Sequence, residues 1–194
     1  MPRVTALRPA QPGRVLVELD GERWRTISLD VAARSGLSIG LELDRERLRT
    51  LGRELRRGSA VAAGTKALAR YDRSEQGLRG ILDRKGICER EREEAIAALR
   101  RHGALDDVRF AEARATALAE RGFGDAAIAF KLEQDGIEPE ASAAALTMLE
   151  PERERAVCLA ARRGASARTA RWLAARGFSP ESVEAALPTE DLAT

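Results

Sequence analysis

The residues best suited to chemistry in this chain are arginines, which gather in two clusters. Only three of the 33 basic residues are lysines. A guanidinium can bind a phosphate or a carboxylate through two parallel hydrogen bonds. The clusters therefore predict contact with nucleic acid or an acidic protein surface, although both could instead be solvated helix faces of an arginine-rich protein. The first contains Arg70, Arg73, Arg79, Arg84 and Lys85, and the second contains Arg162, Arg163, Arg168, Arg171 and Arg176.

Catalytic chemistry has little support in the sequence. His102 is the only histidine, and it precedes Gly103 at the end of a predicted helix, where a cation favours the helix dipole. No nucleophile and carboxylate accompany it in a triad pattern, and no P-loop motif is present. We therefore expect a protein that is not an enzyme and that needs no cofactor.

Metal binding and disulfide bonding are not expected either. The acidic run over residues 89–94 alternates with arginines, which predicts a solvated helix face with intrahelical ion pairs. Cys88 and Cys158 are seventy residues apart and have no neighbouring histidine. Free thiols in a reducing cytoplasm are the expectation for such cysteines.

The bulk composition indicates a globular protein of one or two domains. The chain has 194 residues, and its 33 basic side chains nearly balance 31 acidic ones. This balance excludes a polycation that coats DNA indiscriminately. No apolar stretch approaches the roughly 18 residues of a spanning helix, and the first residues lack the apolar core of a secretory signal. We expect a cytoplasmic protein without membrane contact.

The first thirty residues predict β structure. Residues 14–19 and 24–29 carry apolar residues at alternate positions around Asp20-Gly21, which is a strong hairpin signal. Residues 4–8 could add an edge strand. Trp24 lies in the hairpin, and the sequence leaves open whether it is a core residue or an anchor for a partner.

Two helices are predicted to follow the hairpin. Asp30 is placed to cap a short helix that ends at Ser35. Asp44 is placed to cap a longer one that runs to Arg57 and stops at Gly58. One face of this helix carries Leu48, Leu51 and Leu55.

From about residue 60 the sequence is helical and repetitive. Three segments share apolar or small residues at four-residue steps, then a glycine and an apolar residue. The glycines are Gly86, Gly136 and Gly177, which lie 50 and 41 residues apart. Each glycine should take the left-handed conformation that ends a helix. The helices that these glycines end begin at Ser74, Gly124 and Ala165. Ten residues after the glycine, each segment has another apolar residue, namely Ile96, Leu146 and Leu187.

A further helix is predicted before each segment, over residues 66–72, 107–121 and 151–163. Each unit is then a three-helix bundle, and neighbouring bundles should stack into an elongated, curved array. The prediction is a mainly α fold of tandem three-helix repeats after a small β-hairpin extension. Its parts are residues 1–58, 59–106, 107–149 and 150–194. Aromatic residues at apolar repeat positions are expected in the core, namely Phe110, Phe123, Phe130, Trp172 and Phe178.

The set of repeat residues resembles the RecX family. The resemblance rests first on Arg73-Ser74, Leu78, Leu82, Lys85-Gly86-Ile87, Leu99, Gly103, Leu105-Asp106-Asp107 and Arg109-Phe110-Ala111. It continues through Arg121-Gly122-Phe123-Gly124, Ile128, Leu132 and Gly136-Ile137, and then Arg176-Gly177-Phe178, Val183 and Leu187. Gly36-Leu37, Gly40 and Leu43 resemble the extension of longer members.

The resemblance implies a regulator that has no catalytic site. RecX-type proteins bind the RecA filament on single-stranded DNA and mostly inhibit recombination, ATP hydrolysis and co-protease activity. We expect a monomer that contacts this filament through the two clusters and touches DNA weakly, if directly. The alternative is a DNA-binding regulator that uses one three-helix module.

The charge of the middle segment departs from the family pattern. Residues 107–149 carry four basic and eight acidic side chains, a net charge of −4, whereas residues 1–58 carry a net charge of +4. The middle segment is therefore predicted to offer no phosphate-binding face.

Overall fold

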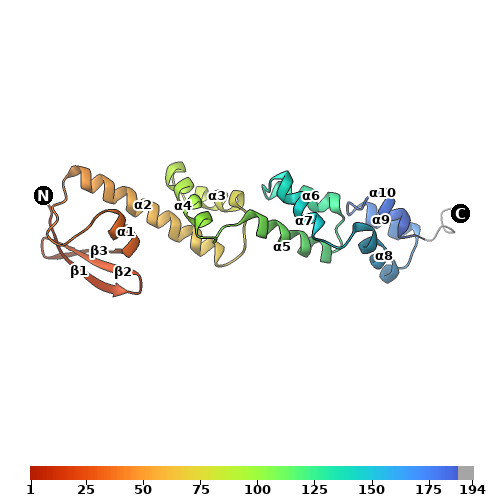
Figure 1. The fold of residues 1–194 in the computed structure, drawn as a ribbon, viewed down its shortest axis with the longest axis horizontal. Helices are drawn as coiled ribbons and strands as arrows, with labels where there is room; N and C mark the ends of the chain where they lie inside the picture. Colours follow the sequence, from red (N-terminus) through yellow and green to blue (C-terminus); the bar gives the residue numbers. More distant parts are fainter. Residues whose placement is uncertain (188–194) are drawn as a thin grey trace. The chain divides into compact units, whose positions relative to one another are not determined.

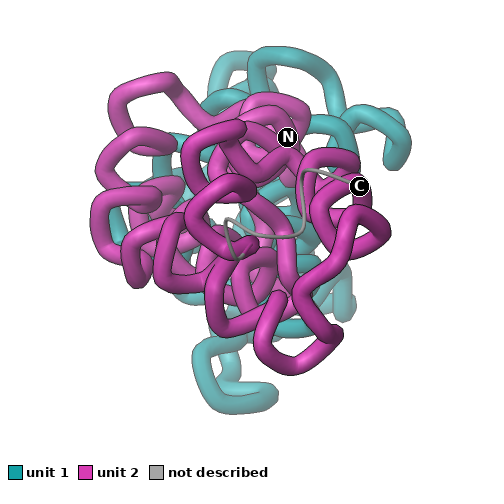
Figure 2. Tube along the Cα trace, turned by 90° about the vertical axis from the view of Figure 1, so that its right-hand side faces the viewer, with its two compact units in different colours: residues 1–70, 79–104 teal, residues 71–78, 105–194 magenta. Residues whose placement is uncertain are grey.

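The computed structural model describes residues 1–187, which form three strands and ten helices (Figure 1). They divide into two compact units (Figure 2). Unit 1 comprises residues 1–70 and 79–104, and unit 2 comprises residues 71–78 and everything described from residue 105 onward. The predicted fold class, mainly α with a small N-terminal sheet, is confirmed. Residues 188–194, which the prediction placed in the last repeat, lie outside the described part of the chain.

Unit 1 begins with an antiparallel sheet of three strands, Val4–Gln11 (β1), Arg14–Leu19 (β2) and Glu22–Ser28 (β3), in the order β1-β2-β3. The predicted hairpin is confirmed. Asp20 and Gly21 both have positive φ, 51° and 88°, as a two-residue hairpin turn of the primed type requires. Trp24 on β3 is 41% exposed and so does not belong to the core.

The first helix has a different cap from the predicted one. Helix α1 spans Leu29–Arg34, and the hydroxyl of Ser28 accepts a hydrogen bond from the Val31 N–H at 3.2 Å. Asp30, the predicted cap, lies inside the first turn and pairs with Arg34 at 2.9 Å. Ser28 has the extended backbone of a capping residue, which residues inside a helix cannot adopt.

The second helix is longer than predicted. Helix α2 spans Arg45–Leu68 and is capped by Asp44, as expected, but it continues through Gly58. A Cβ at Gly58 would lie 2.6 Å from Cγ2 of Val31, so the glycine permits close packing of α1 rather than ending the helix. The separate helix predicted at 66–72 is therefore wrong, because residues 66–68 are the last turn of α2. Leu51 is buried in the unit 1 core with residues of the sheet and α1, whereas Leu48 is 42% exposed.

The remaining helices follow the predicted repeat. They are α3 (Glu75–Arg84), α4 (Glu89–Arg101), α5 (Asp107–Glu120), α6 (Asp125–Gln134), α7 (Pro139–Thr147), α8 (Glu152–Arg163), α9 (Ala167–Ala174) and α10 (Pro180–Ala185). The expected helices at 107–121 and 151–163 correspond to α5 and α8. The cap of α9 is Ser166, one residue after the predicted start at Ala165. None of the helices in the described residues is both long enough and apolar enough to cross a membrane.

The three repeat glycines end their helices as predicted. Gly86, Gly136 and Gly177 have φ of 71°, 79° and 81°. After each glycine the next residue donates its N–H back to the helix. The bonds run from Ile87 to the Leu82 carbonyl, from Ile137 to Leu132 and from Phe178 to Leu173. This is the hydrogen bond of the Schellman motif.

Unit 2 contains two apolar clusters, one for each complete three-helix group. Helices α5, α6 and α7 bury Leu118, Ile128 and Leu132, and helices α8, α9 and α10 enclose Leu173 and Phe178. The expectation that the aromatic residues at repeat positions lie in the core is wrong at one of them. Phe130 is 57% exposed because it lies on the face of α6 opposite the buried Ile128 and Leu132.

The two groups meet through backbone contact at a glycine. The Gly124 N–H donates to the Arg176 carbonyl at 2.9 Å, and the Ala126 N–H donates to the Gly177 carbonyl at 3.3 Å. A Cβ at Gly124 would overlap the Gly177 carbonyl group. Only glycine therefore allows the start of α6 to reach the end of α9.

We predict that Gly124→Ala lowers the free energy of unfolding by about 1–3 kcal/mol, the usual cost of overpacking. Gly124 has φ of −81°, which alanine adopts without strain, so backbone strain does not contribute to the loss. Urea denaturation followed by circular dichroism measures it.

The matched control is Gly52→Ala within α2. A Cβ there meets only the flexible end of Arg56, at 3.5 Å. This change should raise stability by about 0.4–1 kcal/mol, because alanine restricts the unfolded chain. Equal effects of the two substitutions would contradict the proposed contact.

Candidate functional site

Cationic side chains and two aromatic rings alternate on unit 2. Arg163 lies 4.0 Å from the ring centre of Trp172, and Arg176 lies 4.6 Å from the same ring. Arg176 is also 4.8 Å from the Phe123 ring. Lys131 and Arg121 lie 5.0 and 5.6 Å from Phe123. We call these six residues the cation–aromatic ladder.

Several elements position the ladder. Arg121 is the C-cap of α5 and Phe123 lies in the turn before α6, which carries Lys131. Arg163 ends α8, and Trp172 is on α9. Phe123 and Trp172 are each half-buried against the apolar cluster of their own group. The rings therefore pack partly in the core, as predicted, and also contact the cations.

The positive charge of the ladder has no acidic partner. None of its four cations forms an ion pair with a carboxylate among residues 1–187, and Arg176 instead donates to the Arg121 carbonyl at 2.8 Å. A cation over an aromatic ring gains only about 0.5–1 kcal/mol at exposed sites, so its charge remains available. The ladder can therefore receive anionic oxygens, either phosphate or carboxylate.

The second predicted cluster is divided by the structure. Arg163 and Arg176 belong to the ladder, whereas Arg162 lines a separate cavity with Cys158 on α8. Arg168 is exposed, and Arg171 donates to the Ala167 carbonyl at 3.3 Å. The ladder gains two cations from the middle segment, Arg121 and Lys131, so that segment does contribute to a cationic face. The prediction missed these two cations because it relied on the net charge of −4, and a net charge does not show where individual charges lie.

The first predicted cluster is distributed over both units. Arg73 belongs to unit 2, whereas Arg70, Arg79, Arg84 and Lys85 belong to unit 1. Arg79 forms a bidentate ion pair with Glu93, with both distances 3.0 Å. Arg70, Arg84 and Lys85 are exposed.

The acidic run on α4 forms ion pairs mainly with other helices. Arg56 of α2 pairs with Glu91 at 2.8 Å, and Asp83 of α3 pairs with Arg92 at 2.7 Å. Only Arg90 and Glu94 form the predicted pair four residues apart. The hydrogen bond from Arg56 lowers the pKa of Glu91, and that from Arg79 lowers the pKa of Glu93. The predicted intrahelical pairs are therefore present, as Arg90–Glu94 and Arg92–Glu93, but side chains of α2 and α3 also form ion pairs with this face.

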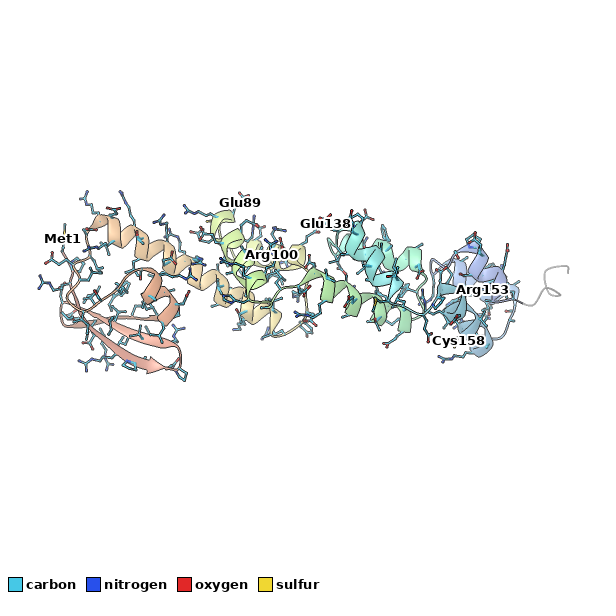
Figure 3. All side chains as sticks on the ribbon, viewed as in Figure 1. Met1, Glu89, Arg100, Glu138, Arg153 and Cys158 are labelled. Carbon is cyan, nitrogen blue, oxygen red and sulfur yellow. The ribbon has the colours of Figure 1, made fainter. Side chains whose placement is uncertain are left out.

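Histidine, cysteine and carboxylate groups do not gather into a metal site in the described residues. His102 is the C-cap of α4, the position predicted for it. Cys88 and Cys158 are free and exposed. Figure 3 labels Cys158, which lies on α8.

A half-buried ionic network holds the Phe123 backbone in place. Glu152 accepts hydrogen bonds from the Asp125 N–H at 2.7 Å, the Ser179 N–H at 3.1 Å and the Ser182 hydroxyl at 2.9 Å. Arg155, only 8% exposed, pairs with Asp125 and donates to the Phe123 carbonyl at 2.9 Å. These bonds join α6, α8 and α10.

Burial affects the two carboxyl groups of this network differently. Burial raises the pKa of Asp125, although the charge of Arg155 acts against it. Burial alone would also raise the pKa of Glu152, but hydrogen bonds from Ser179, Asp125 and Ser182 outweigh it and lower that pKa. Glu152 is therefore the anion that the folded state stabilises.

We predict that Glu152→Gln lowers the free energy of unfolding at pH 7 by about 1.5–3 kcal/mol, the range for hydrogen bonds to charged groups. The folded-state pKa of Glu152 lies below its ordinary value of 4.5. Its contribution is thus present above that value and is lost as the pH falls through the folded-state pKa. The difference in free energy of unfolding between variant and parent should therefore become smaller below about pH 4.5. Urea denaturation at several pH values measures it.

The control is Glu154→Gln on the same helix, where the side chain is exposed. It should change stability by less than about 0.5 kcal/mol. A loss for Glu152→Gln that did not depend on pH would contradict the role of the carboxylate.

The middle segment of the chain matches a known protein family. Residues 106–146 match the family model of the second three-helix domain of RecX. No curated protein matches the chain by sequence.

Two solved structures share the fold. A crystal structure of a regulatory protein RecX aligns with a TM-score of 0.83 at 22% identity and covers 96% of this chain and 98% of that one. RecX from Lactobacillus salivarius aligns with a TM-score of 0.59 at 21% identity and covers 66% of this chain and 92% of that one. Together with the domain match, these similarities confirm the resemblance to the RecX family.

Proposed function

We propose that this chain, a RecX-family protein by its second three-helix domain and its fold, binds the RecA filament on single-stranded DNA and inhibits it. The observation that carries the proposal is the RecX domain at residues 106–146 within a RecX fold that covers 96% of the chain. The proposal includes inhibition of recombination, ATP hydrolysis and co-protease activity, and a monomer in the cytoplasm.

The contacts of the described residues support a binding role. The cations of the ladder form no ion pair with a carboxylate in the described part of the chain, and two of them and one ring come from the matched RecX domain. The proposed organisation keeps an N-terminal part at 1–58 and three repeats at 59–106, 107–149 and 150–194. Repeats that contact adjacent RecA protomers would compete with strand entry or promote disassembly of the filament.

The first test is the DNA-dependent ATPase rate of RecA, titrated with this protein. We expect the rate to fall at or below one molecule per RecA protomer. The double substitution Arg163→Gln/Arg176→Gln should raise the concentration needed for half inhibition about tenfold, since the loss of about 1.4 kcal/mol of binding free energy has that effect.

The matched control is Arg45→Gln/Arg153→Gln. Both side chains are exposed, lie outside the ladder and form no ion pair among residues 1–187, and their loss removes the same charge. Arg153 lies on α8 (Figure 3). An unchanged ATPase rate with the parent protein would refute the proposed function, and equal effects of the two variants would refute the role of the ladder.

A second candidate, direct DNA binding, is favoured by the unpaired cations of the ladder. In this case the protein would bind duplex DNA without RecA, with an affinity that falls steeply as salt rises. The double substitution Arg163→Gln/Arg176→Gln should then make the slope of log affinity against log salt shallower by about two, one unit for each lost phosphate contact. Fluorescence anisotropy measures this slope. Weak binding, or a slope that the substitution leaves unchanged, would contradict the candidate.

A further inference from the structure

A cavity of about 370 Å³ lies within unit 2, where residues 71–78 meet α5 and α6. Its walls include the side chains of Arg73, Phe110 and Arg114. Arg114 pairs with Asp135 at 3.0 Å, and both side chains are about one-third exposed, at 39% and 32%, so the cavity reaches the surface. This volume is within the range of about 300–1,000 Å³ that is typical of ligand pockets.

One residue that lines the cavity, Arg73, has a buried donor without an acceptor. The Nε–H of Arg73 is buried and has no hydrogen-bond acceptor, the one such side-chain atom found in the described part of the chain. The neighbouring contact of Arg73 is the Tyr71 ring, 5.7 Å from the guanidinium. A buried donor without an acceptor costs free energy. The Arg73 guanidinium also forms no ion pair with a carboxylate among residues 1–187, so its charge is available to a ligand in the cavity.

We call the contact of residues 74–75 with residues 107 and 135 the first joint, and the contact of residues 124–125 with residues 152 and 176 the second joint. The two have the same construction. Glu75 at the start of α3 donates its N–H to Asp107 at 2.8 Å, and Asp125 at the start of α6 donates its N–H to Glu152 at 2.7 Å. The Ser74 hydroxyl reaches the Asp135 carbonyl at 2.5 Å, and the Gly124 N–H reaches the Arg176 carbonyl at 2.9 Å. The two joints are therefore equivalent, and both lie within unit 2.

The residue that precedes the helix differs between the two joints. Arg73 precedes Ser74 as Phe123 precedes Gly124. Phe123 is covered by Arg176 and Lys131, so the second joint is closed by the chain itself. Arg73 contacts the Tyr71 ring and lines the cavity. The first joint therefore keeps an open cavity next to a cation, whereas cations cover the ring at the second joint.

The chemistry of the cavity favours a carboxylate over a phosphate. Two carboxylates, Asp72 and Asp135, line it beside the two guanidinium groups, so its net charge is zero. These carboxylates repel a phosphate, which carries up to two negative charges, more strongly than a single carboxylate, whose one charge the Arg73 guanidinium can balance. The walls formed by Phe110, Ala113 and Ala117 suit the methylene groups of a glutamate and an adjacent apolar side chain.

We propose that this cavity is a docking pocket for an acidic side chain of a partner protein. A glutamate next to an apolar residue fits it best. The carboxylate binds the guanidinium of Arg73, and the apolar neighbour contacts Phe110 and the two alanines. This assignment does not depend on the identity of the partner.

The test uses the full chain and short peptides, without RecA or DNA. In ¹H–¹⁵N spectra, the Nε–H signal of Arg73 is identified by its loss in Arg73→Lys. Acetyl-Leu-Glu-Leu-amide should move this signal and saturate at a concentration on the order of 1 mM. Acetyl-Leu-Gln-Leu-amide and inorganic phosphate should move it at least fivefold less.

Two variants that fill the cavity provide the second arm. Ala117→Leu and Ala113→Leu change exposed positions of α5, so the fold should persist, while the response to the glutamate peptide should fall at least fivefold. Ala143→Leu, an exposed position of α7, is the matched control and should respond as the parent does.

Three outcomes would overturn the proposal. They are no shift with the glutamate peptide, equal shifts with the glutamine peptide, and an unchanged response after the cavity is filled. A shift with phosphate alone would show an anion site of a different kind. Because RecA is absent from this experiment, its failure is distinguishable from failure of the proposed function.

Discussion

The structure of unit 2 depends on one repeated contact. An acidic side chain at the start of one helix accepts a hydrogen bond from the backbone N–H at the start of an earlier helix, as Asp107 does from Glu75 and Glu152 does from Asp125. The first N–H groups of a helix have no partner inside it, and an anion there is favourable. Each contact thus satisfies a free donor and joins two helices at a defined point.

The two joints share this contact but differ in the groups around it. At the second joint, Gly124 brings two backbone segments together, and the rings of Phe123 and Trp172 fill the surrounding space. Cations then line those rings, which places on unit 2 four positive charges that form no ion pair with a carboxylate among residues 1–187. At the first joint the same geometry leaves Arg73 beside an open cavity. The protein therefore has a cationic surface at one joint and a specific pocket at the other.

The sequence predicted most of the fold but less of the site. The Asp20-Gly21 turn and the three repeat glycines were recognisable because local backbone conformation requires those residues. Gly58 looked like the same signal, yet it serves close packing of Val31, a tertiary contact that no local pattern reveals. Arg163 and Arg176 were identified as site residues, whereas their partners Arg121 and Lys131 were hidden in a segment of net negative charge. Their placement depends on contacts between helices that are distant in sequence.

Binding to preassembled filaments tests the central claim most directly. RecA filaments formed on single-stranded DNA with a non-hydrolysable ATP analogue are sedimented with this protein, beside free RecA and bare single-stranded DNA. The account predicts that the protein sediments with the filaments in a saturable way, and that it binds free RecA and bare DNA at least tenfold more weakly. Equal binding to bare DNA, or no binding to the filaments, would contradict it.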